Sequence, residues 1–410
     1  EIRMISLKRF FPLKKSSADG EWSGRTTGIG PVAVIDWSVI AAVVALLLIG
    51  LVMVYSASIS LGDSPKYQTS ESYFAVRHAV YMAIGLCVGF GVFKVPLVRW
   101  NRVAYILGAI GIFFLVIVFV PGVGKSVNGS VRWIGLGPIN IQVSELVKFI
   151  SVIFIARFVV TRQAYMHSYS KGLVPVLAYI LLVAGLLAFQ PDLGATVVIS
   201  AIVLGIVFLG GLSWRIILPL GAVMLVTIVS SIILSPWRTA RVFAYLYPWD
   251  PENQIGKAYQ LTHSLIAFGR GEIFGVGLGA SVEKMHYLPE AHTDFILAVI
   301  GEELGLVGFT IVLFLFYWLV RRAFEIGRQA VRLERTFSGL VAQGIGLWIG
   351  VQSLINIGVA IGVFPTKGLT LPLVSYGGSS LVVTLCAIAL LLRVDFENRL
   401  LMRGQRRTAF

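Results

Sequence analysis

Charged residues and cysteines are scarce in this chain of 410 residues, and each scarcity excludes a class of protein. Only 13% of the residues are charged and 57% are hydrophobic, which is more apolar surface than a soluble core of this length needs. The two cysteines, Cys87 and Cys386, both lie in apolar runs, so they predict neither a disulfide framework nor a zinc site. The composition therefore predicts a polytopic membrane protein.

A basic tail precedes the first apolar run. Residues 1–33 mix Gly and Ser with Lys and Arg, which predicts a cytoplasmic tail close to the membrane. No cleavable signal peptide is expected, because the first apolar run begins only after about thirty polar residues. The net charge of +14 would suggest nucleic acid in a soluble protein, but here the distribution of charge over the loops matters more. We expect no nucleic-acid partner.

Ten apolar stretches follow, each close to the roughly 20 residues needed to cross a bilayer. They predict an all-α membrane domain of ten spans over residues 34–394, with a cytoplasmic C-terminal tail at 395–410. The predicted spans are 34–57, 77–95, 102–121, 144–161, 172–189, 192–211, 215–235, 294–320, 339–362 and 378–394.

Lysine and arginine determine the predicted orientation. An even number of spans places both ends on one side, and most of the 34 basic residues fall in the tails and loops of that side. Both ends are therefore expected in the cytoplasm. The cations that fall in the outer loops violate this bias and need an explanation; they are Lys66, Arg77, Lys125, Arg132, Arg238, Arg241, Lys257, Arg270, Lys284 and Lys367.

The longest connection, 236–293, lies on the outer side between the seventh and eighth spans. It contains an amphipathic stretch from Tyr259 to Phe268 that could lie along the outer leaflet, and then a series of glycines. These glycines lack the spacing and the strand–helix context of a nucleotide-binding loop, and they lie where ATP is not available. A loop of this length in a compact domain is usually functional or a partner surface.

The stretch from Tyr287 to Glu303 carries the strongest functional signal. A polar loop with His292 and Asp294 runs directly into an apolar span. An acid inside hydrocarbon costs several kcal/mol, so Asp294 should lie at the interface or in a wet cavity, where a functional role is the default. The alternative is that Asp294 caps the helix. Local sequence leaves these two interpretations evenly balanced.

Two other polar groups stand near predicted spans three and four. A Gly- and Ser-rich loop begins at Lys125 and ends in Arg132 and Trp133, which could bind substrate or anchor the loop at the interface. Glu145 and Lys148 are three residues apart on one helical face. A local ion pair that makes both tolerable in the membrane explains them better than contact with a ligand.

Further polar residues lie later in the chain. Asp192 follows a proline and could cap the sixth span. Arg238 and Arg241 could bind lipid headgroups in general or one phosphate specifically. Lys367 lies in a backbone broken by Gly and Pro that enters the last span, and such backbone is tolerated only against protein or a cavity.

Together, these features place several cations and one uncommitted acid on the outer face. Arg and Lys are the usual partners of phosphate oxygens, and a carboxylate beside them is what a general base needs. No pair of histidines or cysteines offers a metal cage, although a lone divalent ion bridging a carboxylate and a diphosphate would leave no sequence signal. The implied substrate is an anionic, lipid-borne molecule reached from the outer leaflet.

Several long motifs allow the chain to be compared with a known family. They are Arg132-Trp133, Gln190-Pro-Asp-Leu-Gly, Tyr287-Leu-Pro-Glu-Ala-His-Thr-Asp-Phe, Gly301-Glu-Glu-Leu-Gly and Pro365-Thr-Lys-Gly-Leu-Thr-Leu-Pro-Leu-Val-Ser-Tyr-Gly-Gly-Ser-Ser. In this wording and order the chain resembles the SEDS proteins, bacterial glycosyltransferases of shape, elongation, division and sporulation. The resemblance covers residues 34–394 and is closest to the division branch (FtsW), with the elongation branch (RodA) as the near alternative.

The resemblance implies a ten-span fold that polymerises lipid II into glycan strands at the outer face of the bacterial inner membrane, at the division septum. It implies a single-span class B penicillin-binding protein (an FtsI-like transpeptidase) as partner, and the FtsQ–FtsL–FtsB complex as activator. It also implies support by a divalent cation, Mg²⁺ or Mn²⁺, and no organic cofactor. The catalytic acid of the family motif falls on Asp294.

On this basis we expect Asp294 to take the proton of the acceptor hydroxyl, whose oxygen displaces undecaprenyl diphosphate from the donor sugar. A single inverting displacement needs a base and no protein nucleophile. The diphosphate charge must be neutralised, and we expect this role for Arg132, Arg241 and Lys367, with Lys125 and Arg238 as weaker candidates. His292, Asp192, Glu145 and Lys148 are expected to be structural or supporting.

Two functions from other classes remain open at this level. A lipid II flippase would also need a cationic cavity, and in addition a polar path through the membrane. The fourth span offers only Glu145, Lys148 and Arg157 for such a path. A scaffold that recruits the crosslinking enzyme through its spans would need Asp294 only as a helix cap.

Overall fold

A computed structural model describes residues 35–61, 70–127, 130–136, 139–165, 168–212, 214–366 and 368–404. Residues 34–410 form one compact unit. The predicted basic tail at 1–33 and two of the predicted outer cations, Lys66 and Lys367, lie outside the described residues.

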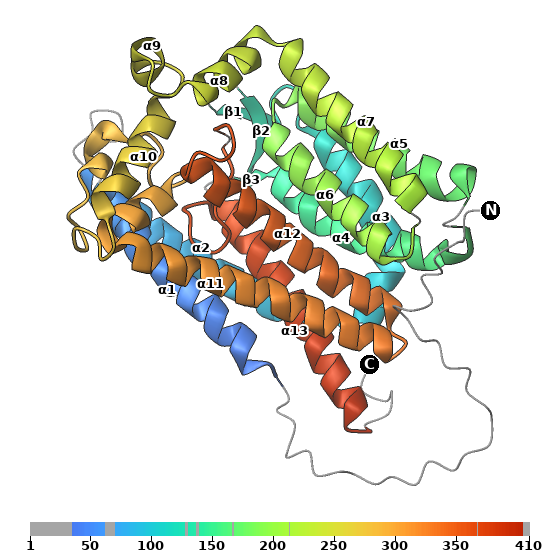
Figure 1. Ribbon diagram of the computed structural model, residues 1–410. Coiled ribbons are helices and arrows are strands. Elements are labelled where there is room, and N and C mark those ends of the chain that lie inside the picture. Colours follow the sequence, from blue (N-terminus) through green and yellow to red (C-terminus); the bar gives the residue numbers. More distant parts are fainter. Residues whose placement is uncertain are drawn as a thin grey trace, which may run out of the picture. The chain divides into compact units, whose positions relative to one another are not determined.

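Long helices dominate this unit (Figure 1). They are α1 (Trp37–Ser58), α2 (Tyr73–Lys94), α3 (Leu97–Ile117), α4 (Val143–Thr161), α5 (Val174–Phe189), α6 (Leu193–Leu209), α7 (Trp214–Ile233), α11 (Ile296–Arg332), α12 (Thr336–Ala360) and α13 (Gly378–Met402). Each coincides with one predicted span, because runs of about 20 apolar residues without a breaker form helices in which every backbone group is paired internally.

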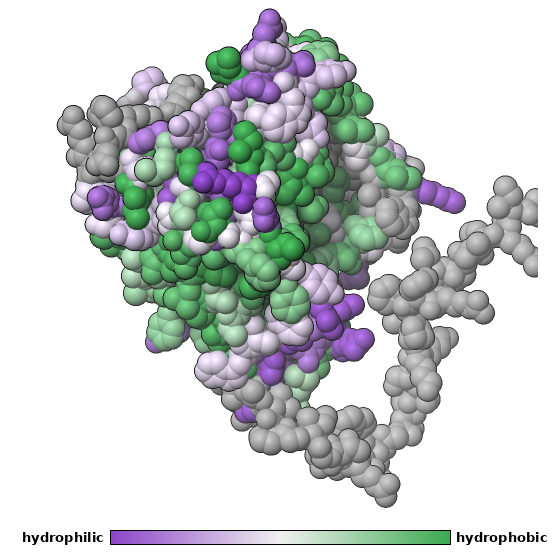
Figure 2. All heavy atoms as spheres, turned by 60° about the vertical axis from the view of Figure 1, so that its left-hand side comes forward, coloured by the Kyte–Doolittle hydropathy of each residue, from purple (hydrophilic) through white to green (hydrophobic). Residues whose placement is uncertain are grey.

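Seven of the helices in the described part of the chain are long and apolar enough to cross a membrane: α1, α2, α3, α5, α11, α12 and α13. Helix α6 is apolar but shorter, and α4 carries three charged residues. Figure 2 shows hydrophobic side chains covering the middle of one face, with hydrophilic ones gathered toward both ends. A helical, polytopic membrane protein is therefore confirmed, whereas the count of ten spans stays a prediction.

Two helices are longer than predicted. Helix α11 continues past residue 320 to Arg332, and α13 continues past residue 394 to Met402. Their extensions are polar, but ion pairs hold them together: Arg322 and Arg399 both contact Asp36, at the start of α1. Apolar length marks only where the membrane ends, so it underestimates a helix that continues along a neighbour.

The expectation of an entirely helical chain misses a small sheet between α3 and α4. Strands β1 (Gly124–Val127), β2 (Ser130–Leu136) and β3 (Ile139–Gln142) pair in that order, both pairs antiparallel. Its last strand is attached to the start of α13, where the backbone N–H of Gln142 donates to the Ser379 hydroxyl at 3.1 Å. The sheet and the short helices of the 236–293 connection lie at the same end of the long helices (Figure 1).

The 236–293 connection contains three short helices: α8 (Pro236–Leu246), α9 (Pro251–Ile255) and α10 (Tyr259–Gly271). Helix α10 confirms the amphipathic stretch expected at 259–268, and it packs against α11 and α12. A π-helical turn, Glu283–Tyr287, completes the connection. Two buried acids of α11 hold this turn in place. Glu303 accepts from the Lys284 ammonium at 2.7 Å, and Glu302 accepts from the backbone N–H of Val282 at 3.0 Å.

Helix α11 is broken at Gly305, whose φ of +65° and ψ of −162° are not helical. The N–H groups of Leu306 and Val307 donate to the carbonyls of Glu272 and Ile273, at 3.0 and 3.1 Å. The carbonyls of Glu302 and Glu303 accept instead from Val276 and Gly277, at 2.9 and 3.1 Å. Helix bonds lost at the break are thus replaced one for one by bonds to the segment 272–277, as burial of backbone polar groups requires.

This contact explains the glycines that sequence patterns left without a function. A Cβ on Gly271 would lie 1.8 Å from the Gly301 carbonyl oxygen, and one on Gly275 would lie 2.1 Å from that of Glu303. Backbone therefore packs directly on backbone, which only glycine permits. The segment 272–277 is fixed to the helix that follows Asp294, and it has no role as a nucleotide loop.

Gly275 and Gly279 give a matched test of this packing. Their φ angles are +80° and +81°, so alanine at either position meets the same backbone strain, but a Cβ on Gly279 has nothing within 4 Å. Gly275→Ala should lower the free energy of unfolding by about 1–3 kcal/mol more than Gly279→Ala, the usual cost of overpacking. Thermal unfolding of the two variants in detergent checks this, and equal Tm values would contradict it.

Candidate active site

Asp294 lies in a tight turn that leads into α11. The Glu290 carbonyl accepts the N–H groups of Thr293, Asp294 and Phe295, and Glu290 itself has a φ of +57°. The helix begins at Ile296 and its capping position is Phe295, with no capping bond from a side chain. Asp294 is therefore not the helix cap, which removes the structural alternative that the sequence left open.

Asp294 is half-buried and lies against a loop from the far end of the chain. A Cβ on Gly368 would lie only 3.0 Å from its Oδ2, so this glycine lets the loop approach the acid closely. Burial, followed by repulsion from Glu290, raises the pKa of Asp294 to about 7, and the positive charge of Arg132 opposes the rise. An acid with this pKa is suited to take up a proton near neutral pH.

Arg132, on β2, is the cation whose charge opposes the rise in the pKa of Asp294. Its Nε donates to the Gln190 carbonyl at 2.8 Å, and its Nη2 donates to the Pro191 carbonyl at 3.0 Å and to the Ser130 hydroxyl at 3.1 Å. Neutral partners fix the guanidinium in place. No carboxylate in the described part of the chain forms a salt bridge with it, so its charge remains available to an anion.

Two other predicted residues lie on the same sheet. Trp133 pairs with Lys125 on β1 and with Gln142 on β3. The register slips by one residue between Lys125 and Ser126, so Arg132 has no partner on β1 and forms a β-bulge. Lys125 is exposed, and its ammonium donates to the Asn140 side chain at 3.3 Å. The charge of Arg132 thus acts on the acid, while Lys125 and Trp133 are paired with each other across β1 and β2.

A buried polar chain runs beneath the site. The Lys148 ammonium is fully buried; it donates to Glu145 at 2.8 Å and to the Gln352 amide oxygen at 2.7 Å. The expected local ion pair is therefore present, and it extends to α12. The Gln352 Nε2 in turn donates to the Thr370 carbonyl at 2.9 Å, which connects α4 with the loop beside Asp294.

Asp192 and His292 have structural contacts of their own. Asp192 caps α6 by accepting from the N–H of Ala195 at 3.0 Å, as one interpretation of the sequence expected, and it also accepts from the Ser144 hydroxyl at 3.0 Å. The buried His292 ring lies 4.8 Å from the ring of Phe74 and 5.6 Å from that of Tyr376. Burial lowers the pKa of His292 below its usual value, which suits a neutral packing role.

Five of the other predicted cations fall into three groups. Arg238 and Arg241 lie on α8, where burial lowers the pKa of Arg241. Lys284 is paired with Glu303, and Arg270 approaches Glu302 at 3.6 Å, so these two outer cations are explained by the acids of α11. Lys367 lies outside the described residues.

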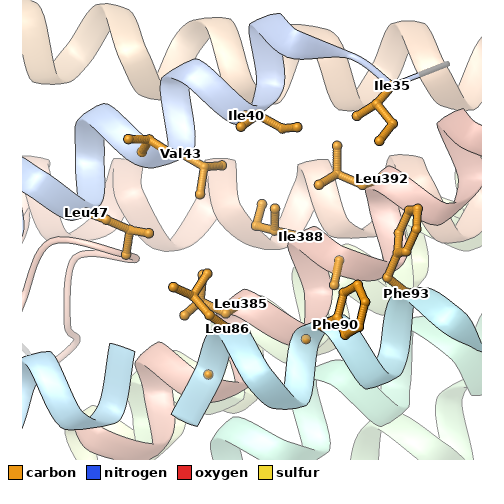
Figure 3. Close-up of a pocket in the computed structure, with 14 residues that line it drawn as sticks. Ile35, Ile40, Val43, Leu47, Leu86, Phe90, Phe93, Leu385, Ile388 and Leu392 are labelled. Carbon is orange, nitrogen blue, oxygen red and sulfur yellow. The ribbon is translucent and has the colours of Figure 1, made fainter. Parts of the chain in front are cut away.

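Within the described part of the chain no group of three His, Cys, Asp or Glu side chains could hold a metal ion. A recess of about 320 Å³ between α1, α2 and α13 is lined by apolar side chains and two glycines, among them Leu47, Leu86 and Ile388 (Figure 3). It offers nothing to a charged sugar phosphate. None of the predicted site residues lines this recess.

Sequence reasoning missed two residues of this site. Gln352 and Asn356 stand one turn apart on α12 and bind the backbone around Asp294, at Thr370 and at Leu369. Two side-chain amides four residues apart in an apolar span were the available signal, because polar residues inside a membrane helix are costly unless they bind something.

The buried pair should respond asymmetrically to mutation. Lys148→Met strands the Glu145 carboxylate in an apolar interior and should cost about 3–5 kcal/mol of unfolding free energy. Adding Glu145→Gln removes the stranded charge, so the double variant should be more stable than the single one. Thermal unfolding of the three proteins measures this. A double variant that is less stable than Lys148→Met would contradict the pairing.

The comparisons with known proteins agree with this architecture. The family model for the cell cycle proteins FtsW, RodA and SpoVE matches residues 36–400. The chain is 51% identical over 408 residues to the probable peptidoglycan glycosyltransferase FtsW of Polynucleobacter necessarius, covering 98% of this chain and 96% of that protein. It is 54% identical over 370 residues to the protein of the same name from Burkholderia thailandensis, covering 90% and 80%.

Solved structures give the same result. A chain from a structure entitled "Structural coordination of polymerization and crosslinking by a peptidoglycan synthase complex" superposes with a TM-score of 0.70 at 29% identity, covering 89% of this chain and 98% of that one. The rod shape determining protein RodA of Thermus thermophilus superposes with a TM-score of 0.64 at 29% identity, covering 88% and 96%.

Proposed function

The chain belongs to the FtsW, RodA and SpoVE family of cell cycle proteins, and on this premise we propose that it is a peptidoglycan glycosyltransferase of the division type. It polymerises lipid II into glycan strands at the outer face of the cytoplasmic membrane during septal wall synthesis. The relatives that share half of its sequence carry the FtsW name, which favours the division branch over the elongation branch.

Asp294 acts as the general base. It accepts the proton of the acceptor N-acetylglucosamine hydroxyl, whose oxygen attacks the anomeric carbon of the donor N-acetylmuramyl unit while the bond to undecaprenyl diphosphate breaks. One displacement converts the α-linked donor into a β-glycosidic product. The observation that carries this assignment is a half-buried aspartate that does not occupy the capping position of α11 and whose pKa burial raises to about 7.

The leaving diphosphate needs positive charge, which Arg132 supplies beside the acid. Arg241 and Lys367 complete this set, with Lys125 and Arg238 as weaker contributors and Trp133 as a contact for substrate. Glu145, Lys148, Asp192 and His292 support the fold around the site through the contacts described above.

A divalent cation, Mg²⁺ or Mn²⁺, would fit this arrangement only if the protein and the substrate both supplied ligands to it. Mg²⁺ is commonly held by one or two carboxylates plus substrate phosphates. Within the described part of the chain no group of three His, Cys, Asp or Glu side chains is available to such an ion, so most of its ligands would come from the diphosphate of the substrate. When bound, the ion would neutralise charge on the leaving group.

The proposed setting is the bacterial inner membrane at the division septum, with both termini cytoplasmic. The basic N-terminal tail (1–33) and the C-terminal tail (395–410) would flank a ten-span domain whose 236–293 connection is extracytoplasmic. A class B penicillin-binding protein would crosslink the strands, as the similarity to a chain of a peptidoglycan synthase complex supports. The FtsQ–FtsL–FtsB complex would activate the pair.

Asp294→Ala should abolish glycan polymerisation while leaving folding and partner binding intact. A general base contributes roughly 10²–10⁴-fold to the rate. Purified protein with its partner and lipid II, with glycan length read on a gel, measures the loss. Asp250→Ala is the matched control, because Asp250 is an exposed aspartate of the connection that precedes Asp294 and makes no capping bond. Near-normal glycan from Asp294→Ala would refute the assignment.

The polymerisation rate should rise as the pH passes through about 7. The raised pKa means that Asp294 is mostly protonated below that pH, and a protonated carboxyl cannot act as a base. Initial rates with saturating lipid II, measured between about pH 5.5 and 8.5, define this acidic limb of the pH–rate profile. A rate that is flat across the range, with binding of lipid II unchanged, would contradict a base of this pKa.

A further inference from the structure

One amide on α12 contacts both the catalytic turn and the loop opposite it. The Asn356 Nδ2 donates to the Asp294 carbonyl at 2.9 Å and to the Leu369 carbonyl at 2.5 Å. Asn356 is 1% exposed, so water does not compete for these bonds. The Asp294 carboxylate packs on Gly368, the residue just before Leu369. The amide therefore ties the turn of Asp294 to the loop, together with the backbone bond from the Tyr376 N–H to the His292 carbonyl at 3.0 Å.

A second amide holds the next residue of the same loop. Gln352, one turn before Asn356, donates to the Thr370 carbonyl at 2.9 Å. Its amide oxygen accepts from the Lys148 ammonium at 2.7 Å and from the Trp348 indole at 2.8 Å, which fixes its orientation. Two successive carbonyls of the loop, at 369 and 370, are thus bound by two amides of one helix face.

We propose that Asn356 and Gln352 are positioning residues that hold the Gly368–Thr370 loop and Asp294 in register, so that the carboxylate meets the acceptor hydroxyl. This inference rests on the proposed role of Asp294 as the base. In this role neither residue touches the substrate, and both act by fixing the position of the loop and of Asp294.

The chemistry of the amide explains why these positions are not simply apolar. The uncharged amide nitrogen carries two N–H donors and can therefore bind two carbonyls at once, whereas a hydroxyl has one donor and an ionised carboxylate has none. The Asn356 Oδ1 is buried without a hydrogen-bond partner among the described residues, which costs free energy. The cost of that orphaned oxygen indicates that the two donor bonds are what the position requires.

Loss of the hydrogen bonds from Asn356 and Gln352 to the loop should have two consequences that loss of a purely structural contact would not have. A misplacement of about 1 Å can lower the rate about 10²-fold. The charged groups that act on Asp294 are Glu290, in its own turn, and Arg132, from β2. A carboxylate released from Gly368 gains water while these charges stay, so its pKa should fall toward that of an ordinary aspartate.

Asn356→Leu tests the inference, because leucine fills the site and removes both donors. We expect kcat to fall about 10²-fold with KM for lipid II nearly unchanged, and the acidic limb of the rate profile to move to lower pH. Asn398→Leu is the matched control. Asn398 is equally buried and donates to the Ile326 carbonyl at 3.1 Å, from α13 to α11, in the extension beyond the predicted spans.

The control should lose comparable thermal stability and keep the wild-type pH profile. An Asn356→Leu protein with wild-type kcat and pH profile overturns the inference, as does one whose kcat falls with an unshifted profile. Should Asn356→Leu not fold, Asn356→Ser keeps one donor and should show the same shift to a smaller extent. In each case Asp294→Ala is measured alongside. An active Asp294→Ala protein refutes the proposed base itself. If Asp294→Ala is inactive, a negative result for Asn356→Leu refutes only the positioning role.

Discussion

Polar groups inside the apolar bundle must be paired, and this constraint organises the region around Asp294. Lys148 is fully buried, and it is tolerated because Glu145 and Gln352 both bind its ammonium. Gln352 then binds the Thr370 carbonyl, and Asn356 binds those of Leu369 and Asp294. Because each of these groups would be costly alone, the whole chain of contacts is maintained together. The acid is held from α12 and, through it, from α4.

The same constraint governs the break in α11. A helix interrupted at Gly305 would leave N–H and carbonyl groups unpaired, and the segment 272–277 supplies replacements for them. The acids Glu302 and Glu303 on the helix immediately before the break bind the turn that precedes the active-site loop. The 236–293 connection is therefore fixed to the helix that follows Asp294 by backbone bonds and by buried charges, with glycines where the two backbones meet.

Much of this could be predicted from sequence, and the failures have physical causes. Long apolar runs revealed every long helix, because membrane helices satisfy their own backbone. The strands escaped notice because they are only four to seven residues long. The helix extension to Met402 escaped notice because it is stabilised by ion pairs such as that of Arg399 with Asp36. Asp294 was found through its position at the mouth of a span. Its exclusion as a cap needed coordinates, since Asp294 and Phe295 differ by one position at the helix start.

The amides on α12 show most clearly what pattern reasoning lacks. A polar residue in an apolar span indicates that something is bound, but the partner lies in a distant segment that only the fold identifies.

The most direct test of the account is the isosteric variant Asp294→Asn, measured under single-turnover conditions with binding of lipid II determined on the same preparation. The account predicts nearly unchanged binding and a rate of bond formation lower by about 10²–10⁴-fold. An Asp294→Asn protein that forms the glycosidic bond at the wild-type rate would contradict it.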